Sequence, residues 1–213
     1  ATVINHSGSV VTGILVGVGA VSLVGLVNGV IIARFQINAL ITTLATMQIV
    51  RGLGYIVANG QAVGIRQETF FYLGIAEYLG IPIPVWITLF CFVVFGMLLR
   101  QTTFGRNTLA IGGNETAAWL AGVPVTRIKI IIFMLQGGIA AFAGVVLTAR
   151  MTSGQPMTSA GFELEVIAAC VLGGVSLTGG VGSMVAVIVG VLIMGTVQNA
   201  MNLLNVPPFY QYV

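Results

Sequence analysis

Residues able to do acid–base, nucleophilic or metal chemistry are scarce in this sequence. It contains no Asp, one His (His6), one Lys (Lys129) and five Glu. A Ser/His/Asp triad or a multi-His metal site cannot be assembled from these side chains. We therefore expect no catalytic residue and no metal site, and the composition argues against a hydrolase.

Nucleotide binding by the chain itself is also not expected. A phosphate-binding loop needs a Lys directly after its glycine-rich turn, and Lys129 lies far from any such turn. The glycine-rich stretch 179–182 has no Lys, so we interpret it as a tight connection between helices near the inner face. No bound cofactor is expected, and any ATP would be used by a partner. The excess of three positive charges is too small and scattered for nucleic-acid binding.

One short segment in a basic loop has the features of a capped helix. Asn114 is placed as its N-cap, and Glu115 lies in the first turn, where the helix dipole favours a negative charge. Gly122 and Pro124 end the segment. It is either a docking element or an ordinary capped connector.

The elements that position these residues are membrane-spanning helices. Of 213 residues, 57% are apolar and 6% are charged, against about 45–50% and 25% in soluble domains. We predict an all-α integral membrane protein, a polytopic transmembrane helix bundle with about six spans. The predicted spans are 9–33, 37–57, 84–99, 128–149, 162–178 and 184–204. We expect 162–178 to cross in full, although Glu163 and Glu165 at its start and Gly173-Gly174 near its end would also permit a broken or re-entrant segment.

Small residues recur at four-residue spacing within these spans, which lets helix backbones approach closely in lipid. The pairs are Gly13 and Gly17, Gly25 and Gly29, Ala140 and Gly144, and Ala186 and Gly190. We interpret them as packing positions.

The distribution of basic residues predicts the orientation. The loop between the third and fourth spans, which contains residues 106–126, is the most basic and is therefore expected to be cytoplasmic. Residues 59–82 and 150–161 then lie outside. We treat residues 1–213 as a single transmembrane domain and expect it to be incomplete at both ends. The aromatic cluster at 209–212 is typical of a membrane interface.

The cytoplasmic loop 106–126 resembles a known motif. Glu115, Ala117, Ala118 and Gly122 resemble the EAA loop of ABC importer permeases, with Thr116 as an additional residue. The stretches GRNTLAIGGNETAAWLAGVPVTRIKIIIF, ARMTSGQPMTSAGFELEVIAACVLGGVSLTGG and NAMNLLNVPPFYQYV are similar to the monosaccharide permease family of ABC transporters. The likeness runs from about Val24 to the last residue and is strongest to permeases for L-arabinose.

This resemblance implies a multi-pass permease of the bacterial inner membrane that carries a monosaccharide, L-arabinose or a related pentose. It implies a second permease subunit as a homodimer partner, a cytoplasmic ABC ATPase that uses the ATP, and a periplasmic sugar-binding protein. The four EAA-like residues would couple the permease to the ATPase. The resemblance thus implies that residues 1–213 are a single transmembrane permease domain with residues 106–126 as its cytoplasmic coupling loop.

Neutral polar residues are the candidates for the sugar path, because hydroxyl and amide groups both donate to and accept from sugar hydroxyls. Interhelical hydrogen bonding without substrate contact is the alternative for each of them. The candidates are Thr42, Thr46, Gln48, Gln136, Gln198, Asn199 and Asn202.

Charged residues within or beside the spans complete the candidates. Arg51 is the one charge well inside a span; it either serves the pathway, extends to the outer interface, or bonds carbonyls freed by a break at Gly52 and Gly54. Glu163 and Glu165 are expected at the outer start of their span. There they either balance the helix dipole and pair with Arg150 or contact a binding protein.

Two other functions are compatible with a helix bundle. A passive channel or secondary carrier would need no docking helix and relies on charges or a broken-helix ion site within the spans. A branched-chain amino-acid permease would favour paired charges for a zwitterion. The near absence of charge within the spans argues against both.

Overall fold

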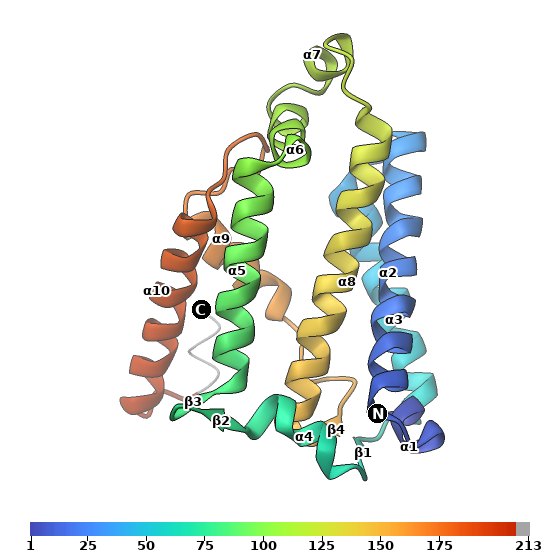
Figure 1. The fold of residues 1–213 in the computed structure, drawn as a ribbon, viewed down its shortest axis with the longest axis vertical. Helices are drawn as coiled ribbons and strands as arrows, with labels where there is room; N and C mark the ends of the chain where they lie inside the picture. The colour runs from blue at the N-terminus through green and yellow to red at the C-terminus, as the bar shows by residue number, and fades with distance from the viewer. Residues whose placement is uncertain (208–213) are drawn as a thin grey trace. The chain divides into compact units, whose positions relative to one another are not determined.

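The computed structural model describes residues 1–207, so the aromatic cluster at 209–212 lies outside the described residues. The chain is mainly helical (Figure 1). The helices are α1 (Thr2–Ser7), α2 (Val10–Phe35), α3 (Ala39–Ala58), α4 (Glu68–Ile75), α5 (Ile83–Gln101), α6 (Thr103–Gly113), α7 (Glu115–Leu120), α8 (Val125–Met151), α9 (Phe162–Leu172) and α10 (Met184–Leu203). The strands are β1 (Val63–Gly64), β2 (Glu77–Tyr78), β3 (Ile81–Pro82) and β4 (Ser153–Gly154).

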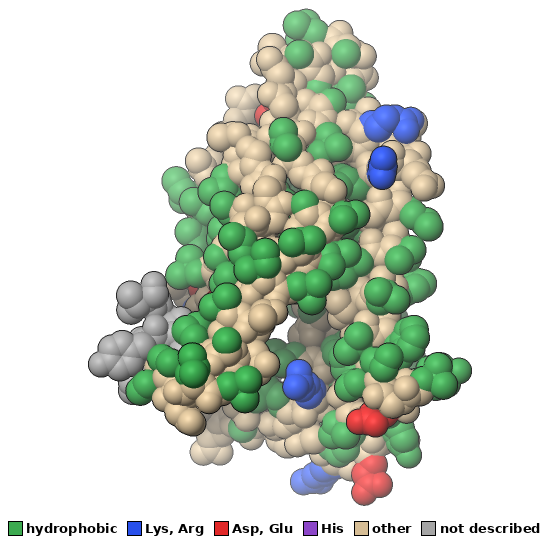
Figure 2. Space-filling view, turned by 90° about the vertical axis from the view of Figure 1, so that its left-hand side faces the viewer, with side chains coloured by type: hydrophobic (Ala, Val, Ile, Leu, Met, Phe, Trp, Pro, Cys, Tyr) green, Lys and Arg blue, Asp and Glu red, His purple; other side chains and the backbone are tan. Residues whose placement is uncertain are grey.

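Within the described residues, five helices are long and apolar enough to cross a membrane. They are α2, α3, α5, α8 and α10, with 19 to 27 residues each. Their ends lie within three residues of the predicted spans. Nearly half of their large apolar side chains are exposed in the isolated chain and few are buried, and Figure 2 shows hydrophobic side chains spread over the visible face with few charged ones. This exposure suits a surface that lipid or other helices cover.

The prediction of a full span at 162–178 is wrong. Helix α9 has 11 residues and ends at Leu172, which gives it a length of about 16 Å against a hydrocarbon core of roughly 30 Å. The cause is the glycine pair that follows. Gly174 takes a left-handed conformation with φ of 79°, which a helix cannot continue. A turn-rich connection at 173–183 then leads to α10.

Two compact units make up the described chain, and the boundary between them falls inside α5. The first unit comprises Ala1–Phe90 and Pro124–Thr158. The second comprises Cys91–Val123 and the chain from Ser159 onward. Both cysteines, Cys91 and Cys170, are free thiols, as expected.

In the first unit, α2 packs against α8 through small residues. A Cβ atom added at Gly25 would meet the carbonyl oxygen of Phe133, and one at Gly29 would lie 2.9 Å from the Cα atom of Ile130. From the other side, a Cβ atom at Gly137 would lie 2.6 Å from the carbonyl oxygen of Val21. The packing role predicted for Gly25 and Gly29 is therefore confirmed.

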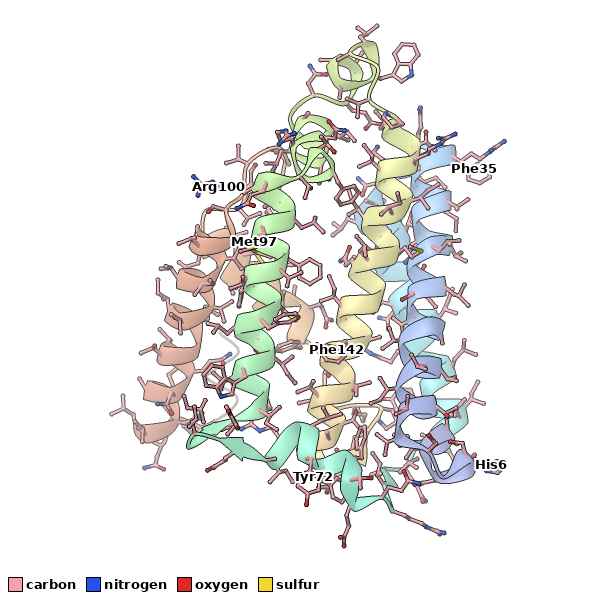
Figure 3. All side chains as sticks on the ribbon, viewed as in Figure 1. His6, Phe35, Tyr72, Met97, Arg100 and Phe142 are labelled. Atoms are coloured by element: carbon pink, nitrogen blue, oxygen red, sulfur yellow. The ribbon has the colours of Figure 1, made fainter. Side chains whose placement is uncertain are left out.

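One end of the first unit is closed by a small core and a short sheet. Ile4, Ile65, Phe70 and Ala149 are buried together, and β1 pairs antiparallel with β4. This pairing brings the loops 59–82 and 150–161 to the same end of the unit, as predicted for two loops on one side. Figure 3 shows His6 and Tyr72 at this end and Phe35 at the opposite end of α2.

In the second unit, α9 and α10 run antiparallel in close contact. A Cβ atom at Gly190 would meet the carbonyl oxygen of Ala169, and one at Gly173 would lie 2.5 Å from the carbonyl oxygen of Ala186. The packing role predicted for Ala186 and Gly190 is thus confirmed. Gly17 and Gly144 of the first unit are different, since a Cβ atom at either meets nothing within 4 Å.

Candidate functional site

Helix α7 is a short helix with a defined cap at each end. The Asn114 side chain accepts a hydrogen bond from the Ala117 backbone N–H at 2.9 Å. At the other end, the N–H of Val123 donates to the carbonyl of Ala118 (3.1 Å), and the N–H of Gly122 donates to the carbonyl of Trp119 (2.9 Å). These two bonds form a Schellman motif with Gly122 at φ of 83°. The predicted helix and its caps are confirmed.

The four residues matched to the EAA loop have different positions on this helix. Ala118 is buried, whereas Glu115 and Ala117 are exposed and Gly122 provides the C-terminal turn. The sequence reasoning did not single out Trp119 and Leu120, which are 66% and 73% exposed. The signal that the sequence already contained is an adjacent Trp and Leu within the predicted short capped helix.

A second helix of this region, α6, was not predicted, and it overlaps the start of the loop 106–126. The hydroxyl of Thr102 accepts from the Gly105 N–H at 3.1 Å and caps the start of α6. Thr102 directly follows the last residue of α5 and is two residues after Arg100 (Figure 3). The last turn of α6 touches the glycine-rich connection before α10. A Cβ atom at Gly112 would meet the backbone nitrogen of Gly180. This contact joins the α6–α7 element to the α9–α10 pair within one unit.

In the first unit, the threonines predicted on one face of α3 meet a residue that the sequence reasoning missed. The Thr46 hydroxyl lies 2.7 Å from the Asn28 side-chain oxygen on α2 and 2.9 Å from the Thr42 carbonyl. Thr42 is buried and donates to the Asn38 carbonyl of its own helix. Asn28 is 8% exposed. An amide in the middle of an uncharged span was the available signal for Asn28.

The other candidates in the first unit are spread over two helices. Gln48 on α3 and Gln136 on α8 are exposed, and Arg51 is half-buried. Helix α3 continues through Gly52 and Gly54 to Ala58, so the break that would have freed carbonyls for Arg51 is absent. That interpretation of Arg51 is wrong, because a glycine inside a helix costs only about 1 kcal/mol and does not end it.

In the second unit, the path candidate Gln198 on α10 bonds to Glu165, which the sequence analysis assigned to balancing the helix dipole or contacting a binding protein. The Gln198 amide donates to the Glu165 carboxylate on α9 at 3.0 Å, and both side chains are half-buried. Asn199 and Asn202 are exposed on α10. The sequence analysis expected Glu165 at the outer start of a full span. That expectation is wrong, because α9 is a half-length helix.

The polar groups of the described spans are suited to binding neutral polar molecules. Among residues 1–207, no group of three or more His, Cys, Asp or Glu side chains is placed to hold a metal ion. The polar side chains within the spans are mainly hydroxyls and amides, which exchange hydrogen bonds with neutral polar molecules.

Comparison with known proteins gives the family. The family model described as "Branched-chain amino acid transport system / permease component" matches residues 1–213. The L-arabinose transport system permease protein AraH of Escherichia coli K12 is 63% identical over the whole chain, which covers 65% of that relative. The L-arabinose ABC transporter permease protein AraH of Azospirillum brasilense is 61% identical over the whole chain and 63% of its own length.

A relative named for ribose has a lower sequence identity to this chain. The ribose import permease protein RbsC of Bacillus subtilis is 45% identical over 87% of this chain and 58% of its own length. No solved structure matches the chain. The chain spans less than two thirds of the length of these relatives. With a family model that matches every residue and, among residues 1–207, five helices able to cross a membrane, the chain belongs to the family of branched-chain amino acid transport system permease components, which are multi-pass membrane proteins.

Proposed function

We propose that this chain is the membrane-spanning part of a permease that imports a monosaccharide, with L-arabinose as the first candidate, in an ABC transporter. One observation carries the proposal: 63% identity over the full chain to a relative named as an L-arabinose permease, against 45% to one named for ribose. The localisation that follows is the bacterial inner membrane. The permease subunit itself is not an enzyme, and ATP is used by a partner.

The proposed site of coupling to that partner is α7. Its caps define a short, compact helix, called here the docking knob (Glu115–Leu120). Its exposed face offers Glu115, Ala117, Trp119 and Leu120 to another protein. The remaining partners are a second permease subunit, which would complete a homodimer, and a periplasmic sugar-binding protein. The contact between Gly112 and Gly180 gives movement of α7 a route to α9 and α10.

The residues proposed for the sugar path are the neutral polar side chains of each unit, on α3 and α8 together with Arg51 in the first unit and on α10 in the second. These side chains exchange hydrogen bonds with hydroxyl groups without holding the sugar tightly. Of these residues, Thr46 and Gln198 each share a hydrogen bond with a neighbouring helix. The path residues on α3 and α10 therefore also support helix packing.

The test is reconstitution of the permease, expressed at its natural length, with candidate ATPase and binding protein in lipid vesicles. We expect L-arabinose, in the presence of its binding protein, to stimulate ATP hydrolysis and sugar uptake together. Uptake that proceeds without ATP would instead identify a passive or secondary carrier. Stimulation by leucine and not by sugars would identify an amino-acid permease, the activity named in the family description.

A matched variant pair tests the coupling role of α7 in the same vesicles. Glu115→Gln removes an exposed charge that the family resemblance implicates, whereas Glu77→Gln removes an exposed charge in β2, outside the loop 106–126. We expect sugar-stimulated hydrolysis to fall for Glu115→Gln and to be kept for Glu77→Gln. Full stimulation in a double variant of Glu115 and Gly122 would contradict the assignment.

A further inference from the structure

Glu165 on α9 and Gln198 on α10 form a polar pair. The Gln198 amide nitrogen donates to a carboxylate oxygen of Glu165 over 3.0 Å. On the side of α10 turned away from Gln198, Val189, Leu192, Ile193 and Val197 line an apolar surface hollow together with Thr196. The polar pair and the apolar hollow therefore lie on different faces of α10, and Asn202, four residues after Gln198, adds a polar side chain to the face of the pair.

Helix geometry places this pair between the middle of α10 and about two thirds of its length. Gly190, which fixes the contact of α10 with Ala169, is six residues after Met184, or about 9 Å along the axis. Glu165 lies four residues before Ala169 on the antiparallel helix, which adds about 6 Å and gives about 15 Å. Gln198 is 14 residues after Met184, or about 21 Å along the axis, so both residues fall within the span of a hydrocarbon core of roughly 30 Å.

The backbone before α9 supports a polar surrounding at this depth. Residues 159–161 form turns rather than helix, and Gly161 has φ of 88°. Irregular backbone in the hydrocarbon region occurs only where protein covers it or where it lines a water-filled cavity. A carboxylate at the same depth is also costly and is expected to face the bundle interior or such a cavity.

We propose that Glu165 and Gln198 form a binding station for the hydroxyl groups of the sugar in transit, an assignment that rests on the proposed function as a sugar permease. A carboxylate offers about four acceptor positions, and the Gln198 amide occupies one of them. Sugar hydroxyls donate to the others, while the carbonyl oxygen of Gln198 accepts from a further hydroxyl. The ligand class is a neutral polyhydroxylated molecule.

The experiment compares Glu165→Gln with the matched control Thr196→Val in the reconstituted transporter. Thr196 lies half a turn before Gln198, and its hydroxyl bonds to the Leu192 carbonyl of its own helix. We expect Glu165→Gln to lower L-arabinose uptake about tenfold, since a hydrogen bond to a charged group is lost. Thr196→Val is expected to keep wild-type uptake.

Monodeoxy sugars separate a binding role from a structural one. If Glu165 accepts from one hydroxyl, wild-type protein discriminates against the analogue that lacks it, and Glu165→Gln loses this discrimination. The same binding protein delivers the sugars to the wild-type and the Glu165→Gln transporter. Its own preference therefore cancels when the uptake of the analogue relative to L-arabinose is compared between the two transporters. An equal loss for all sugars would show that the pair only links helices, and unchanged uptake would also overturn the proposal.

The outcomes also separate this proposal from the proposed function. If wild-type protein takes up no sugar, the proposed function has failed, and this assignment fails with it. If wild-type protein transports sugar and Glu165→Gln matches it in rate and discrimination, only the binding station is refuted. Should Glu165→Gln not assemble, Gln198→Asn shortens the amide by one carbon and supports the same comparison.

Discussion

The hydroxyl of Thr46 on α3 lies 2.7 Å from the side-chain oxygen of Asn28 on α2, and Asn28 is almost fully buried. This bond joins two neighbouring spans by side-chain polar atoms. Hydrogen bonds between helices in lipid contribute on average about 0.6 kcal/mol and up to roughly 2 kcal/mol. The bond is therefore a stabilising link of modest size.

Replacing Thr46 by Val is expected to destabilise the protein by about 1 kcal/mol, because the isosteric side chain leaves the Asn28 oxygen without its donor. Thr43→Val is the matched control, since the Thr43 hydroxyl bonds only to carbonyls of its own helix, those of Ala39 and Leu40. The measurement is the unfolding free energy in mixed detergent micelles. Equal losses in both variants would show that the contact with α2 contributes nothing.

Gly25→Ala is expected to force α2 and α8 apart, because the new methyl group would meet the Phe133 carbonyl. Overpacking of this kind costs about 1–3 kcal/mol. Gly17→Ala on the same helix should be neutral or slightly stabilising, since its methyl group enters an open groove of about 400 Å³. Thermal unfolding of the two variants in detergent makes the comparison. A Gly25→Ala protein as stable as Gly17→Ala would contradict this packing.

Gly112→Ala tests whether movement passes from the α6–α7 element to the connection before α10. Its methyl group would collide with the backbone of Gly180, whereas a methyl group at the neighbouring Gly113 stays 4.0 Å from the nearest atom. Coupling between sites is typically worth about 1–3 kcal/mol. We expect sugar stimulation of ATP hydrolysis to fall at least about fivefold in Gly112→Ala and to persist in Gly113→Ala. Loss of stimulation in both variants would indicate general damage to the loop.

The five long spans were predictable because each carries a long, nearly uncharged run of apolar residues, which periodicity and length suffice to detect. The α7 caps were predictable because Asn114 and Gly122 act locally. The short α9 was not predicted, because whether Gly173-Gly174 ends a helix depends on how closely Gly173 packs against α10. The roles of Asn28 and Glu165 were missed for the same reason, since their partners lie on other helices and a single sequence does not contain the register between helices.

Gly122→Ala tests the conformational requirement at the end of α7. Its φ of 83° is accessible to Gly and tolerated by Asn, whereas Ala in this left-handed conformation costs about 1–2 kcal/mol. We expect Gly122→Ala to weaken binding of the partner ATPase by several-fold and Gly122→Asn to bind more tightly than Gly122→Ala. Affinity measured by titrating the ATPase onto the solubilised permease makes the comparison. Equal affinities would show that this turn does not position the docking knob.

Trp119→Ala is expected to weaken ATPase binding most strongly among these variants. An exposed Trp on a compact knob has the properties of an interface hot spot, where truncation costs 2 kcal/mol or more, equivalent to roughly 30-fold in affinity. The Trp119 side chain is 66% exposed, so its removal should leave the stability of the permease itself nearly unchanged. Leu79→Ala is the control, because Leu79 is 78% exposed in the turn between β2 and β3, outside the loop 106–126. Lost affinity of Trp119→Ala for the ATPase, with an unchanged unfolding temperature, would separate docking from folding. Wild-type affinity of Trp119→Ala would show that Trp119 is not in the interface.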